Sequence, residues 1–405
     1  MESVDLLIAN ASELLTLKGP KKPRIGEQMN RLSIIKNGSV AIRNGLIVDV
    51  GRNLRYKSDV TIDASGKLVM PGFVDPHTHV VFAGSREFEL DSKLAGIPYL
   101  EIQKRGGGIF YTVSATRKAS STQLLQQSKK RLNIMLSYGT TSCEAKSGYG
   151  LDVETEIKVL KVQKKLEQSH PMNLVSTFLG AHAIPKDQRS TEYVRTVITE
   201  MIPRIKNLAR FCDVFCEKGI FTVAQSRKIL DTGKQYGLIP KIHADEIVDT
   251  GGASLAAEVG AISADHLLMS SETGLRAMAQ NGVIGVLLPG TPFCSMMQRY
   301  APARQIIDCG VPVALATDLN PNCWTESMQL MIQLACLKMR MTPAEAVTAA
   351  TFNAACAIGL QDQVGSLEVG KQADCIILDC PNYQFLPYHF GINLVETVVK
   401  KGFLL

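Results

Sequence analysis

The residues with the clearest capacity for chemistry are histidines and carboxylates that lie far apart along the chain. His77 and His79 form an HxH pair, and on an extended backbone both imidazoles point the same way, within reach of one ion at about 2.0 to 2.1 Å. An HxH pair alone is weak evidence, because two surface histidines would give the same pattern. His243 and Asp318 add a third nitrogen and a carboxylate, and the four side chains together predict a metal site.

Two further residues could act on a substrate beside that metal. Glu246 stands three residues after His243, and a carboxylate next to an activated water can accept its proton and deliver it to a leaving nitrogen. His266 could hydrogen-bond a developing oxyanion. The alternatives are a helix N-terminal carboxylate for Glu246, a packing role for the neighbouring Asp245, and a buried, carbonyl-bonded histidine for His266.

A parallel barrel would bring these residues to one face. Eight strand-like runs alternate with segments of helical period, which favours an α/β fold of the (β/α)8 TIM-like barrel type, with its site at the carboxyl ends of the strands. The HxH pair, His182, His243, His266 and Asp318 all fall at such ends, whereas His170 and His389 do not. The expected strands are 73–75, 140–145, 174–179, 214–217, 240–243, 261–265, 284–288 and 311–316.

Helical periodicity connects these strands. It predicts crossover and C-terminal helices at 154–166, 225–236, 271–280, 326–338 and 342–358. The connection between the first and second strands is unusually long and contains the glycine triplet 106–108. A long ordered loop of this kind usually has a function, so we expect it at the mouth of the barrel.

Both ends of the chain favour a second, smaller domain. Asn37-Gly38 and Asn44-Gly45 are expected hairpin turns between short strands. We expect residues 1–69 and 360–405 to form one composite β-sandwich domain beside a catalytic barrel of residues 70–359. The expected terminal strands are 5–10, 33–36, 39–43, 46–50, 60–63, 364–367, 374–378 and 395–400.

The composition bounds the class of protein. Of 405 residues, 45% are hydrophobic and 20% charged, which is typical of a compact globular chain rather than a disordered or fibrous one. The net charge of +6 is spread out, so a nucleic-acid surface is not expected, while small anionic ligands are allowed. No secretion signal or membrane span is visible, which favours a cytoplasmic protein without a membrane partner.

The ten cysteines are scattered without the spacing of a disulfide framework. They predict reduced thiols in the core of a cytoplasmic protein. Cys212 and Cys216 would share one face of a strand and could form a metal pair, although buried core sulfur is the favoured interpretation.

Longer motifs resemble a known group of enzymes. In chain order, MPGFVDPHTHVVFAG, KIHADEI, SADHL and ATDLNPN resemble the metal-dependent amidohydrolase superfamily. The closer resemblance is to the imidazolonepropionase family, and it extends across nearly the whole chain. The segments that carry it are FAGSREFEL, GGGIFYTVSATR, GTTSCEAKSGYGL, TFLGAHAIP, GSLEVGKQADCIIL and PYHFGINLVETVVKKG. HxH pairs occur in many hydrolases, but GGGI, EAKSGYGL and FLGAHAIP are together far more specific.

That resemblance implies a reaction, a cofactor and a set of site residues. Metal-activated water would open the ring amide of 4-imidazolone-5-propanoate to give N-formimidoyl-L-glutamate, in histidine degradation. One zinc or iron ion per subunit of a homodimer would be held by His77, His79, His243 and Asp318. The catalytic residues would be Glu246 and His266, and the substrate would contact Arg86, Tyr149, His182, Glu246, His266, Asn320 and Asn322.

These implied contacts also have a physical interpretation. The guanidinium of Arg86 and the phenol of Tyr149 suit the propanoate carboxylate, and amides of the glycine triplet could approach the same group. His182 could bond a ring nitrogen or carbonyl. The alternatives are a surface pairing of Arg86 with Glu87 or Glu89, a packed loop aromatic for Tyr149, and a capping or core role for His182.

One segment departs from the family pattern. Members typically have Asn-Pro-Gly-Ser after the metal aspartate, whereas this chain has Asn320-Pro321-Asn322-Cys323. Because asparagine tolerates left-handed backbone, the turn can survive at Asn322, but a serine hydroxyl contact is lost and Cys323 is left out of the site.

Two other functions fit parts of the pattern. A mononuclear deaminase of cytosine or guanine would share the histidines, Glu246 and Asp318, although Arg86 and Tyr149 favour a substrate with a carboxylate. A non-catalytic binding or scaffold protein on a hydrolase fold would be indicated by the loss of a ligand or of Glu246. None of these residues is lost.

Overall fold

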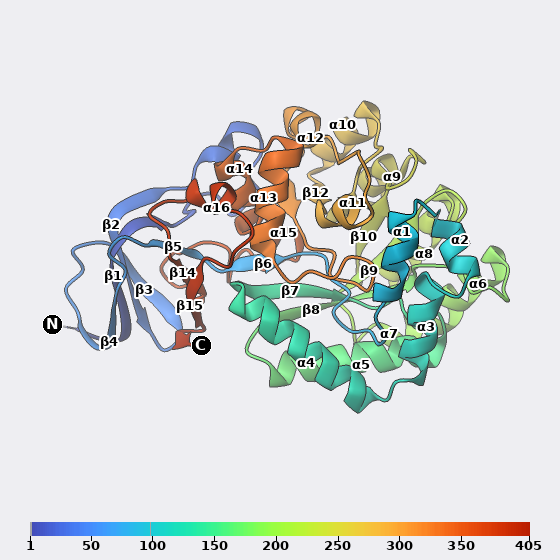
Figure 1. Ribbon diagram of the computed structural model, residues 1–405, viewed down its shortest axis with the longest axis horizontal. Helices are drawn as coiled ribbons and strands as arrows, with labels where there is room; N and C mark the ends of the chain where they lie inside the picture. The colour runs from blue at the N-terminus through green and yellow to red at the C-terminus, as the bar shows by residue number, and fades with distance from the viewer. Residues whose placement is uncertain (1, 98) are drawn as a thin grey trace.

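The computed structural model describes residues 2–97 and 99–405, and Figure 1 shows a barrel of strands and helices with a separate sheet at one end. Eight parallel strands are hydrogen-bonded in chain order from β6 to β13. Their residues are almost entirely buried, since helices cover the outside and side chains fill the interior. The predicted barrel is confirmed, with strands β6 (Phe73–Asp75), β7 (Thr140–Lys146), β8 (Asn173–Ala181), β9 (Phe211–Cys216), β10 (Ile239–Ala244), β11 (Ser263–His266), β12 (Ile284–Leu287) and β13 (Val313–Leu315).

The barrel closes through the residues that follow its first and last strands. The strand pairing described for the chain does not join β6 to β13 directly; instead Thr78 and Leu319 form an isolated parallel bridge. Asp318 donates its backbone N–H to the carbonyl of His77 at 3.1 Å, and His79 donates to Leu319 at 2.9 Å. Closure of the barrel therefore holds the HxH pair and Asp318 side by side.

Helices surround the barrel largely where the periodicity predicts them. Four expected helices agree to within three residues at each end: α5 (Val153–Ser169), α8 (Val223–Gln235), α10 (Glu272–Asn281) and α13 (Met328–Met339). Further helices outside the first connection are α6 (Ser190–Thr196), α7 (Ile202–Ile205), α9 (Gly252–Val259), α11 (Gly290–Cys294), α12 (Ala303–Asp308) and α16 (Phe385–Tyr388).

The single helix predicted at 342–358 is wrong, because two helices replace it. These are α14 (Pro343–Ala349) and α15 (Phe352–Ala357). The carbonyl of Ala350 accepts a hydrogen bond from the Val74 N–H in β6 at 3.0 Å, and Thr351 has non-helical φ and ψ of −131° and −88°. A contact with the barrel thus interrupts a pattern that is locally helical.

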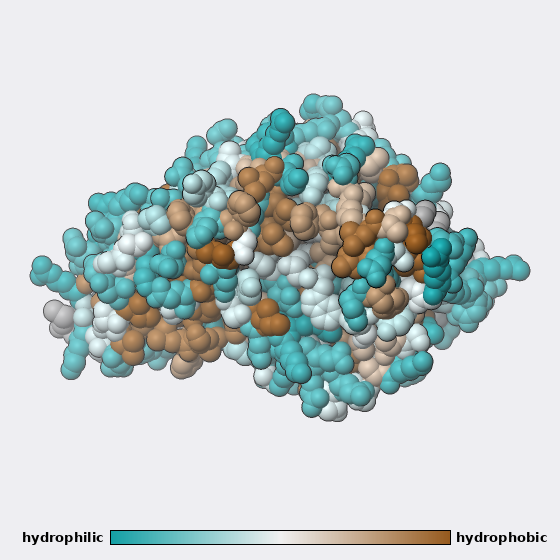
Figure 2. All heavy atoms as spheres, in the orientation of Figure 1, coloured by the Kyte–Doolittle hydropathy of each residue, from teal (hydrophilic) through white to brown (hydrophobic). Residues whose placement is uncertain are grey.

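The long connection between β6 and β7 is mostly helical. It contains α1 (Leu90–Leu94), α2 (Tyr99–Lys104), α3 (Ile109–Lys118) and α4 (Ser121–Ser137), with α1 and α2 at the opposite end of the molecule from the terminal sheet (Figure 1). Apolar side chains gather over α1 and α11 in Figure 2, where Leu94 and Phe293 are more than half exposed. The expectation of a long loop here is wrong, because four helices occupy most of the segment. α1 and α2 are too short to give a clear helical period, whereas α3 and α4, with 10 and 17 residues, were missed.

Both chain ends contribute to one β domain, as predicted, and its eight strands form a single forked sheet. β1 pairs with β4 along its first half and with β5 near its end, so the sheet forks at this strand. Its strands are β1 (Ser3–Leu15), β2 (Ile34–Arg43), β3 (Leu46–Arg52), β4 (Lys57–Asp63), β5 (Leu68–Pro71), β14 (Cys375–Leu378), β15 (Val395–Lys400) and β16 (Phe403–Leu404). The domain limits at 69/70 and 359/360 stay a prediction.

Two local predictions for this sheet are wrong. Asn37 and Gly38 lie inside β2 rather than in a hairpin turn. Asn37 has a positive φ of 51°, but β2 remains paired with the long strand β1 on both sides of it. Asn44-Gly45 is the turn between β2 and β3, as expected. The strand predicted at 364–367 is a turn region instead. Its apolar side chains are buried, and the N–H of Leu367 donates a hydrogen bond to the carbonyl of Thr16, the residue after β1.

All ten cysteines are free thiols. Cys212 and Cys216 are fully buried in β9, and burial raises the pKa of each thiol, which is the environment expected for core sulfur. Within the described ranges, no helix has both the length and the apolar character that crossing a membrane requires.

Candidate active site

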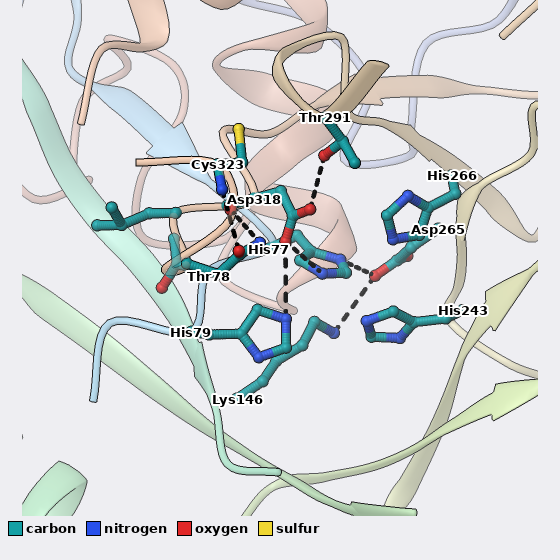
Figure 3. A network of polar contacts seen from close by, with 12 residues as sticks. His77, Thr78, His79, Lys146, His243, Asp265, His266, Thr291, Asp318 and Cys323 are labelled. Carbon is teal, nitrogen blue, oxygen red and sulfur yellow. Dashed lines mark hydrogen bonds and ion pairs between the residues drawn. The ribbon is translucent and has the colours of Figure 1, made fainter. Parts of the chain in front are cut away.

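The four side chains predicted to share a metal lie together at the carboxyl ends of the barrel strands. His77, His79 and His243 each offer a nitrogen, and these three atoms lie within 4.8 Å of one another. Oδ1 of Asp318 lies 3.5 Å from Nε2 of His77 and 3.7 Å from Nε2 of His79 (Figure 3). The pairing of β6, β10 and the segment after β13 around one axis therefore produces a compact group of three imidazoles and a carboxylate.

The protonation of these histidines suits a metal ion. Nδ1 of His77 lies 2.6 Å from Asp265, and Nδ1 of His243 lies 3.1 Å from Asp213. Because a carboxylate accepts hydrogen bonds, each Nδ1 carries the proton and leaves Nε2 with a lone pair. Nε2 of both rings is buried and has no hydrogen-bond partner among the described residues. Burial also lowers the pKa of both imidazoles well below the usual value, so both rings are neutral, as a metal ligand must be.

Backbone conformation at the strand ends aims the site residues. Asp245, His266 and Asp318 have φ of 52°, 78° and 54°, in the left-handed region that residues with a side chain seldom adopt. Such conformations cost about 1 to 3 kcal/mol each and persist where the surrounding structure holds them.

The carboxylate of Asp318 is buried. The hydroxyl of Thr291 donates a hydrogen bond to its Oδ2 at 2.6 Å, and burial raises the pKa of Asp318 to about 6.

Glu246 and His266 lie close to one another beside the three histidines. Oε2 of Glu246 lies 3.8 Å from Nε2 of His266. Burial, and to a smaller extent the negative charge of Glu217, raises the pKa of Glu246 to about 7. Burial lowers the pKa of His266. Glu246 lies outside any helix, since α9 begins only at Gly252, which removes the helix N-terminal alternative.

The carboxylate of Asp245 organises the loop that carries Glu246. It accepts hydrogen bonds from the backbone N–H of Thr250, Gly252 and Ala253 at 2.9 to 3.0 Å, and from the hydroxyl of Ser270 at 2.9 Å. These bonds match the packing role considered for Asp245. The loop between β10 and α9 is thereby tied to the barrel.

The rings of Tyr149 and His182 pack against each other and against the ring of His79. The rings of His79 and His182 are stacked, with centroids 4.9 Å apart and planes at 13°, and Tyr149 lies 5.3 to 5.4 Å from both. Nδ1 of His182 is bonded to the carbonyl of Gly148 at 3.1 Å, and burial lowers its pKa to about 4. His182 is therefore a neutral ring whose Nδ1–H is engaged by Gly148.

Arg86 is held by Glu89 in the segment before α1. Nε and Nη2 of Arg86 donate to the two carboxylate oxygens of Glu89 at 2.7 and 2.8 Å. The pairing with Glu89 that was considered for Arg86 is present, but its expected surface location is wrong, because Arg86 and Glu89 are only 6% and 1% exposed. The backbone N–H of Gly108 donates to Glu89 at 2.7 Å, so this part of the glycine triplet positions Glu89.

Asn320 shapes the turn after Asp318. Its amide group donates to the carbonyl of Asp318 at 2.8 Å, and its oxygen accepts from the backbone N–H of Asn322 and Cys323 at 2.7 and 3.1 Å. Asn322 does not use the left-handed backbone that its type would permit, and it accepts a hydrogen bond from Lys93 of α1 at 2.8 Å. The turn survives without the glycine, and it connects α1 to the rim of the site.

Sequence reasoning missed a group of charged residues beneath the histidines. They are fully buried in neighbouring barrel strands: Glu144, Lys146, Asp213, Lys241 and Asp265. The signal was present, since Lys241 stands in an otherwise apolar strand segment two residues before His243, and residues two apart face the same side of a strand. His170 lies outside the site, bonded to Asn133 at 3.0 Å, and His389 is exposed.

Comparisons with known proteins agree with this geometry. Residues 68–405 match the model of the amidohydrolase family. An imidazolonepropionase from Alkaliphilus metalliredigens is 52% identical, over 98% of this chain and 97% of its own length. One from Geobacillus kaustophilus is 55% identical over the same shares. A zinc-bound adenosine deaminase from Xanthomonas campestris has the same fold, with a TM-score of 0.73 at 19% identity, covering 100% of this chain and 93% of that one. The chain belongs to the imidazolonepropionase family of amidohydrolases.

Proposed function

We propose that this chain hydrolyses 4-imidazolone-5-propanoate to N-formimidoyl-L-glutamate, a step of histidine degradation. Water adds to the ring carbonyl carbon, the bond from that carbon to the ring nitrogen breaks, and the carbonyl becomes a carboxylate. The observation that carries the proposal is the group of His77, His79, His243 and Asp318 with Glu246 and His266 beside it. The names of relatives at 52% and 55% identity support the choice of substrate.

We also propose that His77, His79, His243 and Asp318 hold one zinc or iron ion. Two imidazole nitrogens with free lone pairs, a third imidazole and a carboxylate suit either metal. When bound, the ion would act as a Lewis acid that polarises the ring carbonyl and makes water easier to deprotonate at neutral pH.

The chain's own residues move the protons. Oε2 of Glu246 accepts a proton from the attacking water and delivers it to the departing ring nitrogen. His266, which lies 3.8 Å from that oxygen, stabilises negative charge on the former carbonyl oxygen. The raised pKa of Glu246, about 7, suits a group that must both take up and release a proton near neutrality.

Arg86, Tyr149 and His182 bind and orient the substrate in this proposal, with Asn320 and Asn322 at the rim. Glu89 fixes the guanidinium of Arg86 through two hydrogen bonds, so Arg86 is preorganised to receive the propanoate carboxylate. His182 and Tyr149 line the side next to His79 and can contact the ring.

Arg86→Ala should raise KM by about 10- to 100-fold, because a hydrogen bond to a charged group contributes about 1.5 to 3 kcal/mol. Metal content should stay at the wild-type level, since Arg86 is not among the proposed ligands. Steady-state kinetics and elemental analysis of the same preparation check both. The matched variant Glu89→Gln, which keeps an acceptor for Gly108, should fold and change KM less. Equal losses of substrate and metal binding in Arg86→Ala would contradict the role.

The rate should fall on acidification with an apparent pKa near 7. Glu246 acts as a base only when deprotonated, and its pKa of about 7 means that kcat drops about tenfold per pH unit below that value. Because the charge of Glu217 raises this pKa, Glu217→Gln should shift the acidic limb to lower pH. A pH profile of kcat in both proteins measures this; an unmoved limb would assign it to another group.

The decisive experiment is hydrolysis of freshly prepared imidazolone propanoate, followed by loss of ring absorbance, with and without a chelator. Cytosine and guanine serve as parallel substrates, because a mononuclear deaminase would turn over one of them instead. A metal-loaded preparation without turnover on any cyclic amide would favour a binding protein. We further propose a cytoplasmic homodimer, on the family resemblance; sedimentation analysis tests the dimer.

A further inference from the structure

A network of buried charges lies directly beneath the proposed metal centre. Glu144, Lys146, Asp213, Lys241 and Asp265 are all 0% exposed and come from four barrel strands: β7, and the consecutive strands β9, β10 and β11, with β8 between the two groups. Three carboxylates and two ammonium groups leave one negative charge, far from water. Such groups are costly to bury unless they are paired, so their arrangement calls for a role beyond packing.

Lys146 is the centre of this network. Its ammonium lies 2.6 Å from Asp213, 3.1 Å from Glu144 and 3.3 Å from Asp265. Two of these partners hold metal-site histidines, since Asp213 bonds Nδ1 of His243 and Asp265 bonds Nδ1 of His77. Figure 3 shows the chain of contacts from Lys146 through Asp265 to His77. One ammonium thus links two imidazoles that come from different strands.

Lys241 offers an internal comparison. It is equally buried and bonds the same Glu144 at 2.9 Å, but its other described hydrogen bond goes to the carbonyl of Pro76 at 3.1 Å, and its ammonium lies 5.4 Å from the centre of the Phe211 ring. No described hydrogen bond or ion pair joins it to either aspartate that holds a histidine. Its loss should therefore disturb the core without releasing an imidazole.

The geometry explains why a cation is needed at Lys146. Carboxylates of Glu144 and Asp265 and a nitrogen of His77 lie within 4.8 Å of one another. Without a positive charge between them, Asp265 and Asp213 would repel Glu144 and could move away from the imidazoles. Outer partners of metal ligands set the tautomer and direction of the rings.

We propose that Lys146 is a positioning residue, whose ammonium fixes Asp213 and Asp265 so that His243 and His77 present Nε2 to one ion. Lys146 touches neither substrate nor metal in this scheme. The inference rests on the proposed metal centre. It adds that one ammonium group, that of Lys146, sets the orientation of two proposed ligands, His77 and His243.

Lys146→Met and Lys241→Met test it as a matched pair in the full-length chain. Metal-free protein is titrated with Zn²⁺ against a chelating dye, and Co²⁺ is added separately to record the visible spectrum. Lys146→Met should bind Zn²⁺ about 10- to 100-fold more weakly, the range seen when outer partners of ligands are lost. Its Co²⁺ spectrum should also change. Lys241→Met should keep the wild-type affinity and spectrum, even where thermal unfolding shows a similar loss of stability.

The inference would be overturned if Lys146→Met bound Zn²⁺ as tightly as the wild type. It would also be overturned if Lys146→Met and Lys241→Met lost the same amount of Zn²⁺ affinity. If Lys146→Met does not fold, the double variant with Glu144→Gln removes one charge of each sign and is compared with Glu144→Gln alone. The double variant should bind Zn²⁺ 10- to 100-fold more weakly than that single variant; equal affinities would again refute the role. Failure of the wild type to bind Zn²⁺ would instead refute the proposed metal centre.

Discussion

Glu246→Gln should lower kcat by about 10²- to 10⁴-fold, the range expected when a general acid–base group is lost. The glutamine keeps the size of the side chain but cannot accept the proton of water or pass it to the ring nitrogen. Because Glu246 is not among the four proposed ligands, metal content should be unchanged. Single-turnover kinetics on metal-loaded protein would measure the effect.

Asp249→Asn is the matched control for this variant. Asp249 lies in the same loop, is exposed, and uses its oxygen to accept a hydrogen bond from Gly251 at 3.0 Å, which asparagine can also do. Asp249→Asn removes one negative charge, as Glu246→Gln does, but outside the site. Surface substitutions of this kind usually change the free energy of unfolding by no more than about 0.5 kcal/mol, so kcat should stay within about twofold of the wild type. Similar losses in Asp249→Asn and Glu246→Gln would indicate loop disturbance instead of lost proton transfer.

His243→Ala should abolish both metal retention and hydrolysis. His243 supplies one of the buried Nε2 atoms without a described hydrogen-bond partner, and its removal leaves Asp213 without the imidazole that it orients. Loss of an outer partner costs about 10- to 100-fold in metal affinity, and loss of a ligand should exceed that range. Metal analysis after dialysis, together with residual turnover, provides the measurement.

A thermal shift gives an independent readout of the same variant. Since a metal that binds only the folded state stabilises it, added Zn²⁺ should raise the unfolding temperature of the wild type and not that of His243→Ala. His170→Ala is the control, because His170 is a buried histidine that lies outside the site, where its Nε2 is bonded to Asn133. A His243→Ala protein that retains metal and activity would remove His243 from the proposed ligand set.

Much of the fold follows from local pattern. Apolar runs bounded by turn signals located all eight barrel strands, because parallel strands buried on both faces must be almost continuously apolar. Helical periodicity located α5, α8, α10 and α13 for the similar reason that one face of each packs on the barrel. Where tertiary pairing competes with local preference, as at Asn37-Gly38 and Ala350, the pattern was misleading.

The candidate site was predictable in part. Side chains at strand ends could be assigned to one rim because every parallel strand of a barrel points the same way. The partner of Arg86 could not be chosen between Glu87 and Glu89, since that choice depends on the helical path of the segment after β6. Nor could the sequence show that Lys146 touches Asp213 and Asp265, which depends on the neighbour order and register of the strands.

The order of residues along the chain determined on its own which side chains reach the carboxyl ends of the strands, because alternation and strand direction are local properties. Only the tertiary structure decided how the barrel closes, with Asp318 bonded to the backbone of His77. It also decided which buried carboxylate orients which imidazole. Those contacts join residues from different strands, and their energy depends on distances and burial that no single segment contains.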